Sequence, residues 1–142
     1  MTSRVFGNAP EAVSAARHYV VEQLADVPRA IVDEVAVMVS ELATNCVRHT
    51  ETEFTVKVEH DLKRVRVEVT DHGPGVPTLR VPDATEPTGR GLRIVREIAD
   101  SFGVDPAARA PGKTVWFELY LDPAARPDGT QAQPSARNIP HA

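Results

Sequence analysis

The sequence predicts a single domain of the α/β class, with helices and a β-sheet in one chain. Through the first 49 residues, apolar side chains recur every three or four positions, as on one face of a helix. From Phe54 onward the period changes to two, which is the alternation of a half-buried strand. A chain of 142 residues has the size of one domain and can bury a core.

Two amphipathic helices are predicted first. One covers residues 10–25, with Pro10 in its opening turn and Asn8 or a residue near it as its candidate cap. Its apolar positions are spaced by three and four residues: Val13, Ala16, Val20 and Leu24. The other runs from about residue 28 to residue 49, with Asp26 as its candidate cap. Its apolar positions repeat in the same way: Ile31, Val35, Met38 and Leu42.

Strands are predicted where apolar and polar residues alternate. Residues 54–59 and 64–70 alternate on either side of a short polar turn and indicate a hairpin. Residues 115–121 alternate as a final strand. Shorter signals favour two further strands, near residues 4–7 and 102–104.

Asp71 continues the apolar face of the second hairpin strand. It has the same parity as Val65, Val67 and Val69, so its carboxylate is expected to point inward. A buried charge needs a partner, because burying it unpaired is costly or forces it to take up a proton. A ligand that donates hydrogen bonds would satisfy Asp71. The alternative is that the strand has already ended and Asp71 begins a turn.

A column of polar side chains marks the end of the second helix. Glu41, Asn45 and His49 follow one another at intervals of four, so they lie on nearly the same helix face. They offer a base, an oxygen ligand and a proton carrier. Polar residues at this spacing also occur on ordinary solvated faces, and His49 equally suits the negative end of the helix dipole.

Glycine-containing stretches follow the hairpin. Residues 71–75, DHGPG, form a loop whose glycines let a ligand approach the backbone. Residues 76–88 contain several prolines without periodicity, which predicts a lid. Gly89 and Gly91 then open a third helix, where backbone N–H groups beside the positive dipole end suit a phosphate.

Composition and charge exclude several classes of protein. Charged residues make up 25% and hydrophobic residues 42%, an ordinary globular balance. The formal net charge is −4 and basic residues are scattered, which argues against direct nucleic-acid binding. No apolar run approaches the roughly 20 residues that span a bilayer, and nothing resembles a signal peptide. The single Cys46 fits a reducing cytoplasm. We expect a cytoplasmic protein that does not act at a membrane.

The order of these motifs resembles the ATP-binding domain shared by type II topoisomerases, Hsp90 chaperones, sensor histidine kinases and MutL repair proteins, known as the Bergerat or GHKL fold. Four stretches carry the resemblance: SELATNCVRH at 40–49 (N box), DHGPG at 71–75 (G1 box), GRGL at 89–92 (G2 box) and GKTVWFEL at 112–119 (closing strand). The resemblance implies a two-layer α+β sandwich, with a mixed, mostly antiparallel sheet covered on one face by about three helices. We assign residues 1–121 to this domain and expect residues 122–142 to form a disordered tail rich in proline and alanine.

The resemblance also implies a role for each site residue. Asp71 would accept a hydrogen bond from the adenine amino group, and Asn45 would bind Mg²⁺ through its side-chain oxygen. Glu41, one turn before Asn45, would be the general base. Arg48 and His49 would act only through their charge. The remaining predicted nucleotide contacts come from the glycine boxes and the closing strand: Gly73, Gly75, Val76, Gly89, Arg90, Gly91, Leu92 and Thr114.

Some positions depart from the family pattern. Arg93 stands where sensor kinases often have another glycine, and Lys113 stands before Thr114 where small residues are frequent. Thr114 also has the opposite parity from the apolar Val115, so its place in the pocket depends on the local twist of the strand.

Within the superfamily, the resemblance is closest to the single-domain anti-sigma factor serine/threonine kinases. About 40 residues precede the N-box-like stretch, too few for a phosphoacceptor helix pair, and no transducer domain follows. The resemblance implies a kinase that uses ATP and Mg²⁺ to phosphorylate an anti-sigma factor antagonist and that also binds a sigma factor. Relatives often form homodimers, for which Trp116 and Tyr120 are candidate contacts. Two alternatives remain: a nucleotide-gated binding module with little turnover, and a structural domain without nucleotide.

Overall fold

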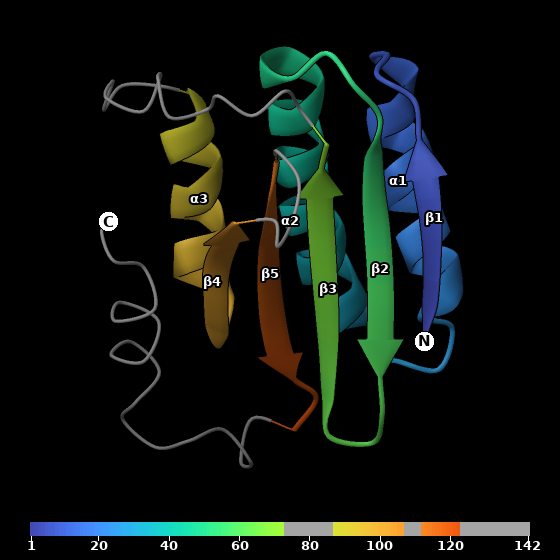
Figure 1. The fold of residues 1–142 in the computed structure, drawn as a ribbon. Helices are drawn as coiled ribbons and strands as arrows, with labels where there is room; N and C mark the ends of the chain where they lie inside the picture. The colour runs from blue at the N-terminus through green and yellow to red at the C-terminus, as the bar shows by residue number, and fades with distance from the viewer. Residues whose placement is uncertain (73–86, 107–111, 123–142) are drawn as a thin grey trace.

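The computed structural model describes residues 1–72, 87–106 and 112–122. Its elements, in chain order, are β1 (Thr2–Phe6), α1 (Glu11–Gln23), α2 (Arg29–His49), β2 (Phe54–His60), β3 (Arg64–Asp71), α3 (Pro87–Ile98), β4 (Ser101–Pro106) and β5 (Lys113–Tyr120). The three helices lie side by side on one face of a five-stranded sheet (Figure 1). The predicted two-layer α+β fold is therefore confirmed. The predicted lid, the glycine loop before it and the predicted tail lie almost entirely outside the described residues. The last two residues assigned to the lid, Pro87 and Thr88, instead form the start of α3, so this helix begins before Gly89.

The strands are ordered β1-β2-β3-β5-β4, and each of these four neighbouring pairs is antiparallel. β3 therefore lies at the centre, with β2 on one side and β5 on the other. Its last residue, Asp71, is opposite Phe54 of β2 and Lys113 of β5. The closing strand thus begins directly beside the residue at which the hairpin ends.

The core lies between the helices and the inward face of the sheet. The alternation predicted for the hairpin is confirmed, because Val56, Val58, Val65, Val67 and Val69 are all buried. α2 lies between α1 and α3 and packs against both (Figure 1). Its buried positions follow the predicted spacing: Ile31, Val32, Val35, Met38, Val39, Leu42, Ala43 and Cys46.

The predicted helix caps are wrong. The residues at the cap positions of α1 and α2 are Pro10 and Pro28, and neither helix start has a side-chain cap. Asn8 instead serves the other end of α2. Its Nδ2 donates to the carbonyl oxygens of Cys46, Thr50 and Thr52 at 3.4, 3.0 and 3.2 Å. These carbonyls end or follow the helix and need donors from outside it, so Asn8 ties the first turn of the chain to the end of α2.

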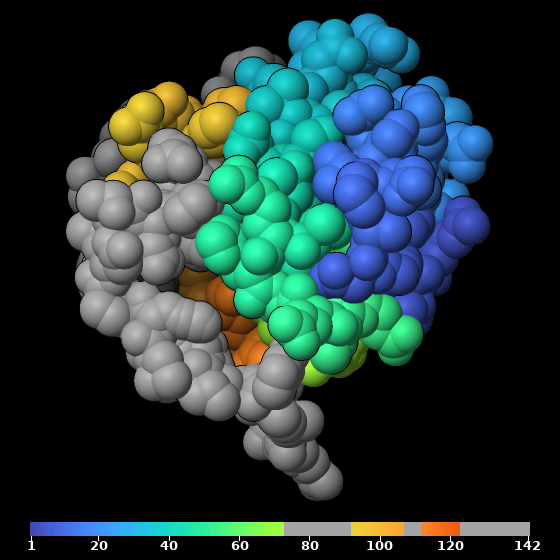
Figure 2. Space-filling model, turned by 90° about the horizontal axis from the view of Figure 1, so that it is seen from above, coloured from blue at the N-terminus to red at the C-terminus, as the bar shows by residue number. Residues whose placement is uncertain are grey.

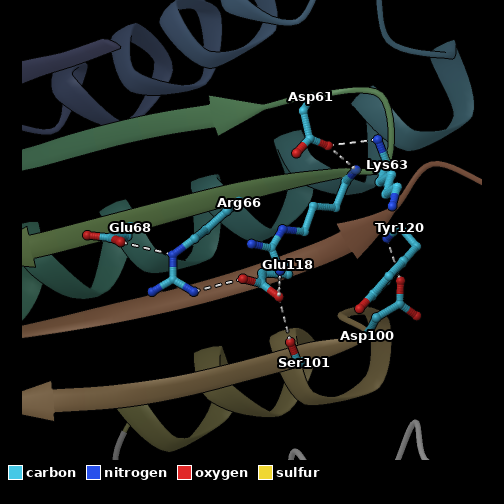
Figure 3. A network of polar contacts seen from close by, with 9 residues as sticks. Asp61, Lys63, Arg66, Glu68, Asp100, Ser101, Glu118 and Tyr120 are labelled. Atoms are coloured by element: carbon cyan, nitrogen blue, oxygen red, sulfur yellow. Dashed lines mark hydrogen bonds and ion pairs between the residues drawn. The ribbon is translucent and has the colours of Figure 1, made fainter. Parts of the chain in front are cut away.

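The face of the sheet opposite the helices carries a network of charged side chains around Glu118 (Figure 3). Glu118 is only 7% exposed and accepts hydrogen bonds from Arg64, Arg66 and Ser101 at 3.2, 2.8 and 3.2 Å. Arg66 also lies over the Trp116 ring, 4.2 Å from its centroid. Trp116 is therefore half-buried under an arginine. Its role as a homodimer contact stays a prediction.

Gly103 on β4 is expected to be intolerant of a side chain. A Cβ there would lie 2.7 Å from the Trp116 ring, and the Arg66 guanidinium also packs on this ring. Gly103→Ala should lower the free energy of unfolding by about 1–3 kcal/mol through overpacking, as measured by urea denaturation. Gly7→Ala is the matched control, since a Cβ at Gly7 meets no atom within 4 Å. Equal stability losses in the two variants would contradict this account.

Candidate functional site

A cavity of about 30 Å³ lies where α2 ends, between the helices and the sheet. Its walls come from α2 and the following residue, from β3, from α3 and from the start of β5: Leu42, Asn45, Cys46, His49, Thr50, Val69, Asp71, Leu92, Lys113 and Val115. Seen from above in Figure 2, β5 (orange) lies recessed beside the green surface at the end of α2. The cavity thus joins segments far apart in the sequence.

Asp71 forms the polar floor of this cavity. It is the last residue of β3 and only 5% exposed, so its predicted inward direction is confirmed and the alternative of a turn beginning there is wrong. Lys113 Nζ donates to Asp71 Oδ2 at 3.1 Å. At Gly112, which has a φ of +111°, an added Cβ would collide with the Asp71 backbone oxygen. Glycine at that position therefore permits the close approach that sets Lys113 opposite Asp71.

α2 contributes the other polar side chains. Asn45 and His49 both line the cavity, so two members of the predicted polar column lie at the same site as Asp71. Glu41, one turn before Asn45, is half-buried and is not among the lining residues. Its role as a base stays a prediction. His49, which the sequence also favoured as a simple dipole partner, lies at the cavity.

Cys46 is a wall residue that the sequence did not single out. It is buried and free. Burial raises the pKa of its thiol from 9.0 to about 12, the negative charge of Asp71 adds to this effect, and Lys113 opposes it. The thiol is therefore an uncharged part of the apolar wall and not a nucleophile.

The Cys46 pKa predicts a specific dependence on pH. The unfolded chain loses the thiol proton near pH 9, whereas the folded chain holds it to about 12. The resulting stabilisation is complete below pH 9 and is lost as pH rises above that value. Urea denaturation from pH 8 to 11 should show this alkaline decline, and Cys46→Ser should reduce it. At pH 8, labelling by Ellman's reagent should be on the order of 100-fold slower in the folded chain than in denaturant; equal rates would refute the assignment.

Apart from Thr114, the other predicted nucleotide contacts divide into three groups. Leu92 lines the cavity. Gly89, Arg90 and Gly91 fall in the first turns of α3, which begins at Pro87. Gly73, Gly75 and Val76 lie outside the described residues.

Among the predicted contacts whose side chains the structure describes, Thr114 points away from the cavity. Its hydroxyl is 2.7 Å from the hydroxyl of Thr70, on the face of the sheet opposite the helices. The reason is strand parity, since its neighbours Lys113 and Val115 point inward. The same parity could have identified Lys113 as a site residue from the sequence.

The cavity has the chemistry of a small-molecule site, with apolar walls and a few convergent polar groups. Asp71 can accept hydrogen bonds, Lys113 can donate them, and Asn45 offers a neutral oxygen of the kind that Mg²⁺ accepts. No group of three or more His, Cys, Asp or Glu residues that could hold a metal occurs in the described part of the chain. A Mg²⁺ ion held by Asn45 would need further oxygen ligands, which the phosphates of a nucleotide can supply.

The structure is thus an α+β domain with a cavity between its central helix and its sheet. A family model described as the histidine kinase-like ATPase domain matches residues 6–119, so the chain belongs to that family. Domains of this family bind ATP, generally with Mg²⁺, which supports an ATP-binding regulatory role. Among solved structures, the chain is similar to a mycobacterial sensor histidine kinase, MprB, with 16% identity and a TM-score of 0.44, over 84% of this chain and 97% of that one.

A comparison with curated proteins found no match. In the described ranges, none of the helices combines the length and the apolar character needed to cross a membrane.

Proposed function

We propose that this protein is an ATP-dependent serine/threonine kinase of the cytoplasm that phosphorylates an anti-sigma factor antagonist and also binds a sigma factor. Membership of the histidine kinase-like ATPase family supports the use of ATP. The observation that carries the proposal is the convergence of Asp71 and Asn45 on one cavity beside Leu92 of α3. A hydrogen-bond acceptor for the nucleotide base and a ligand for the metal ion are then available in the same cavity.

Each side chain has a distinct task in this proposal. Asp71 accepts a hydrogen bond from the adenine amino group, and its burial keeps water from competing for it. Asn45 holds Mg²⁺ through its amide oxygen. The backbone at Gly89 and Gly91, in the opening turns of α3, cradles the phosphates at the positive end of the helix dipole.

Glu41 supplies the proton acceptor. It lies on α2 one turn before Asn45, so its carboxylate is on the same helix face as the metal ligand. Phosphoryl transfer depends mainly on positioning and charge neutralisation, which ATP-bound Mg²⁺ supplies, so a modest base is sufficient. Glu41 takes the proton of the attacking serine hydroxyl.

The proposal is tested by incubating the protein with γ-labelled ATP, Mg²⁺ and an anti-sigma factor antagonist from the same organism. Transfer of label to a serine or threonine of the antagonist is the expected result. Absence of label on the antagonist, while ATP still raises the melting temperature of the protein, would refute the kinase function. A melting temperature unaffected by ATP would refute nucleotide binding itself.

One observation favours a second function, a nucleotide-gated binding module with little turnover. Glu41 does not line the cavity, whereas Asp71 and Asn45 do. In such a module ATP sets the choice of partner and no phosphate is transferred. Homodimer formation is compatible with both functions and is measured by light scattering with and without ATP.

A further inference from the structure

We propose that Lys113 sets the base preference of this site and allows it to accept guanine nucleotides as well as adenine nucleotides. The inference rests on the proposed function, because it concerns the same cavity. It begins from Lys113, the first residue of β5, which lines the cavity and is paired with Asp71.

Lys113 and Asp71 present a hydrogen-bond donor and an acceptor side by side. They are direct partners in the register of β5 and β3, and both line the cavity. Lys113 Nζ lies 3.1 Å from Asp71 Oδ2. An ammonium group has three N–H donors, so it can hold the carboxylate and donate to a further acceptor at the same time. A base edge brought to Asp71 therefore also meets Lys113.

Lys113 is also a wall residue that can yield to a ligand. The cavity of about 30 Å³ has room for a water molecule but not for a base, so the entry of a nucleotide requires a side chain to move. Asp71, Val69 and Val115 are buried in the sheet, whereas the long Lys113 side chain is 35% exposed. It can withdraw toward solvent while β5 keeps its Cα opposite Asp71. The ammonium group then stays at the rim, beside the edge of the bound base.

A carboxylate that faces position 6 of the purine ring, as it does when it receives the adenine amino group, discriminates against guanine. Adenine carries an amino donor at position 6, whereas guanine carries an acceptor oxygen, O6, which a carboxylate repels. Lysine is a common partner of guanine O6. With both residues present, guanine donates from its ring N–H and amino groups to Asp71 and accepts at O6 from Lys113. Adenine donates its amino group to Asp71 and accepts from Lys113 at a ring nitrogen.

The test is calorimetric titration of the full chain with ATP and with GTP, each in the presence of Mg²⁺. The wild-type protein should bind GTP within about tenfold of its ATP affinity. Lys113→Met keeps the length of the side chain and removes its donors, so it should raise the ratio of the GTP Kd to the ATP Kd by about tenfold or more. Lys113→Arg, which keeps donors, should retain the wild-type ratio.

Lys57→Met is the matched control. Lys57 is on β2, and its partners Glu59 and Glu68 are on the face of the sheet opposite the cavity, so its loss should leave the ratio unchanged. An unchanged ratio in Lys113→Met, with ATP still bound, would overturn this inference alone. A wild-type GTP Kd more than about 100-fold above the ATP Kd would also overturn this inference alone. If the wild type binds neither nucleotide, the proposed function fails first and this inference with it.

Discussion

Asp71→Asn is expected to weaken ATP binding by about 10- to 100-fold, the effect of losing a buried hydrogen bond to a charged group. The substitution keeps the size of the side chain. It turns one of the two acceptor atoms into an NH₂ donor, which faces the adenine amino group instead of receiving it. Because the carboxylate is only 5% exposed, water cannot take over its role. The rise in melting temperature with ATP should shrink accordingly.

The control for Asp71→Asn is Asp61→Asn. Asp61 lies in the turn of the hairpin at the opposite end of β3, where its Oδ1 accepts hydrogen bonds from the backbone N–H groups of Lys63 and Arg64. The Asp61→Asn substitution is expected to leave the ATP-dependent shift in melting temperature unchanged. The unfolding of the Asp71→Asn protein is also measured without ligand. If it is still cooperative, the variant is folded and its weaker response to ATP is a binding defect. A full ATP shift in Asp71→Asn would remove Asp71 from the nucleotide site.

The local part of this site could be predicted because it depends on short-range periodicity. Strand parity alone indicates that Asp71 shares the inward face of Val67 and Val69, and the structure confirms it. Helical spacing likewise places Asn45 and His49 on one face of α2, and both line the cavity. These inferences need no knowledge of which strand lies beside which.

The ion pair at the centre of the site could not be predicted in this way. Asp71 and Lys113 meet only because β5 lies between β3 and β4, and strand order depends on the packing of the whole sheet. Alternation within the closing strand gives the direction of the Lys113 side chain but not the identity of its neighbour. The position of Cys46 in the cavity wall was missed for a related reason. α2 packs against both α1 and α3, so it buries more than the single narrow stripe of apolar residues that the sequence pattern indicates.

The predicted helix caps failed because local preference competed with a longer-range contact. Asn8 is a favourable cap by residue type, and the chain before α1 is short enough for it to serve as one. In the folded chain its amide instead reaches the carbonyls at the end of α2, at Thr50 and Thr52. Satisfying several carbonyls there outweighs one cap at a helix start that opens with proline.

Glu41→Gln is expected to lower phosphate transfer to the antagonist by about 10²- to 10⁴-fold, the usual contribution of a general base. Glutamine keeps the shape of the side chain but cannot take a proton. Since Glu41 does not line the cavity, whereas Asp71 and Asn45 do, the affinity for ATP should change little. The measurements are single-turnover transfer of γ-labelled phosphate and, on the same protein, the ATP-dependent shift in melting temperature.

Glu34→Gln provides the matched control for Glu41→Gln. Glu34 is on the same helix, two turns earlier and equally half-buried, and its substitution should leave transfer intact. This comparison also separates the two proposed functions. A selective loss of transfer in Glu41→Gln, with partner binding preserved, supports the kinase. If Glu41→Gln transfers phosphate at the wild-type rate, then Glu41 is not the base. If neither the Glu41→Gln variant nor the wild-type protein transfers phosphate, while ATP still controls partner binding, the nucleotide-gated module is the correct function.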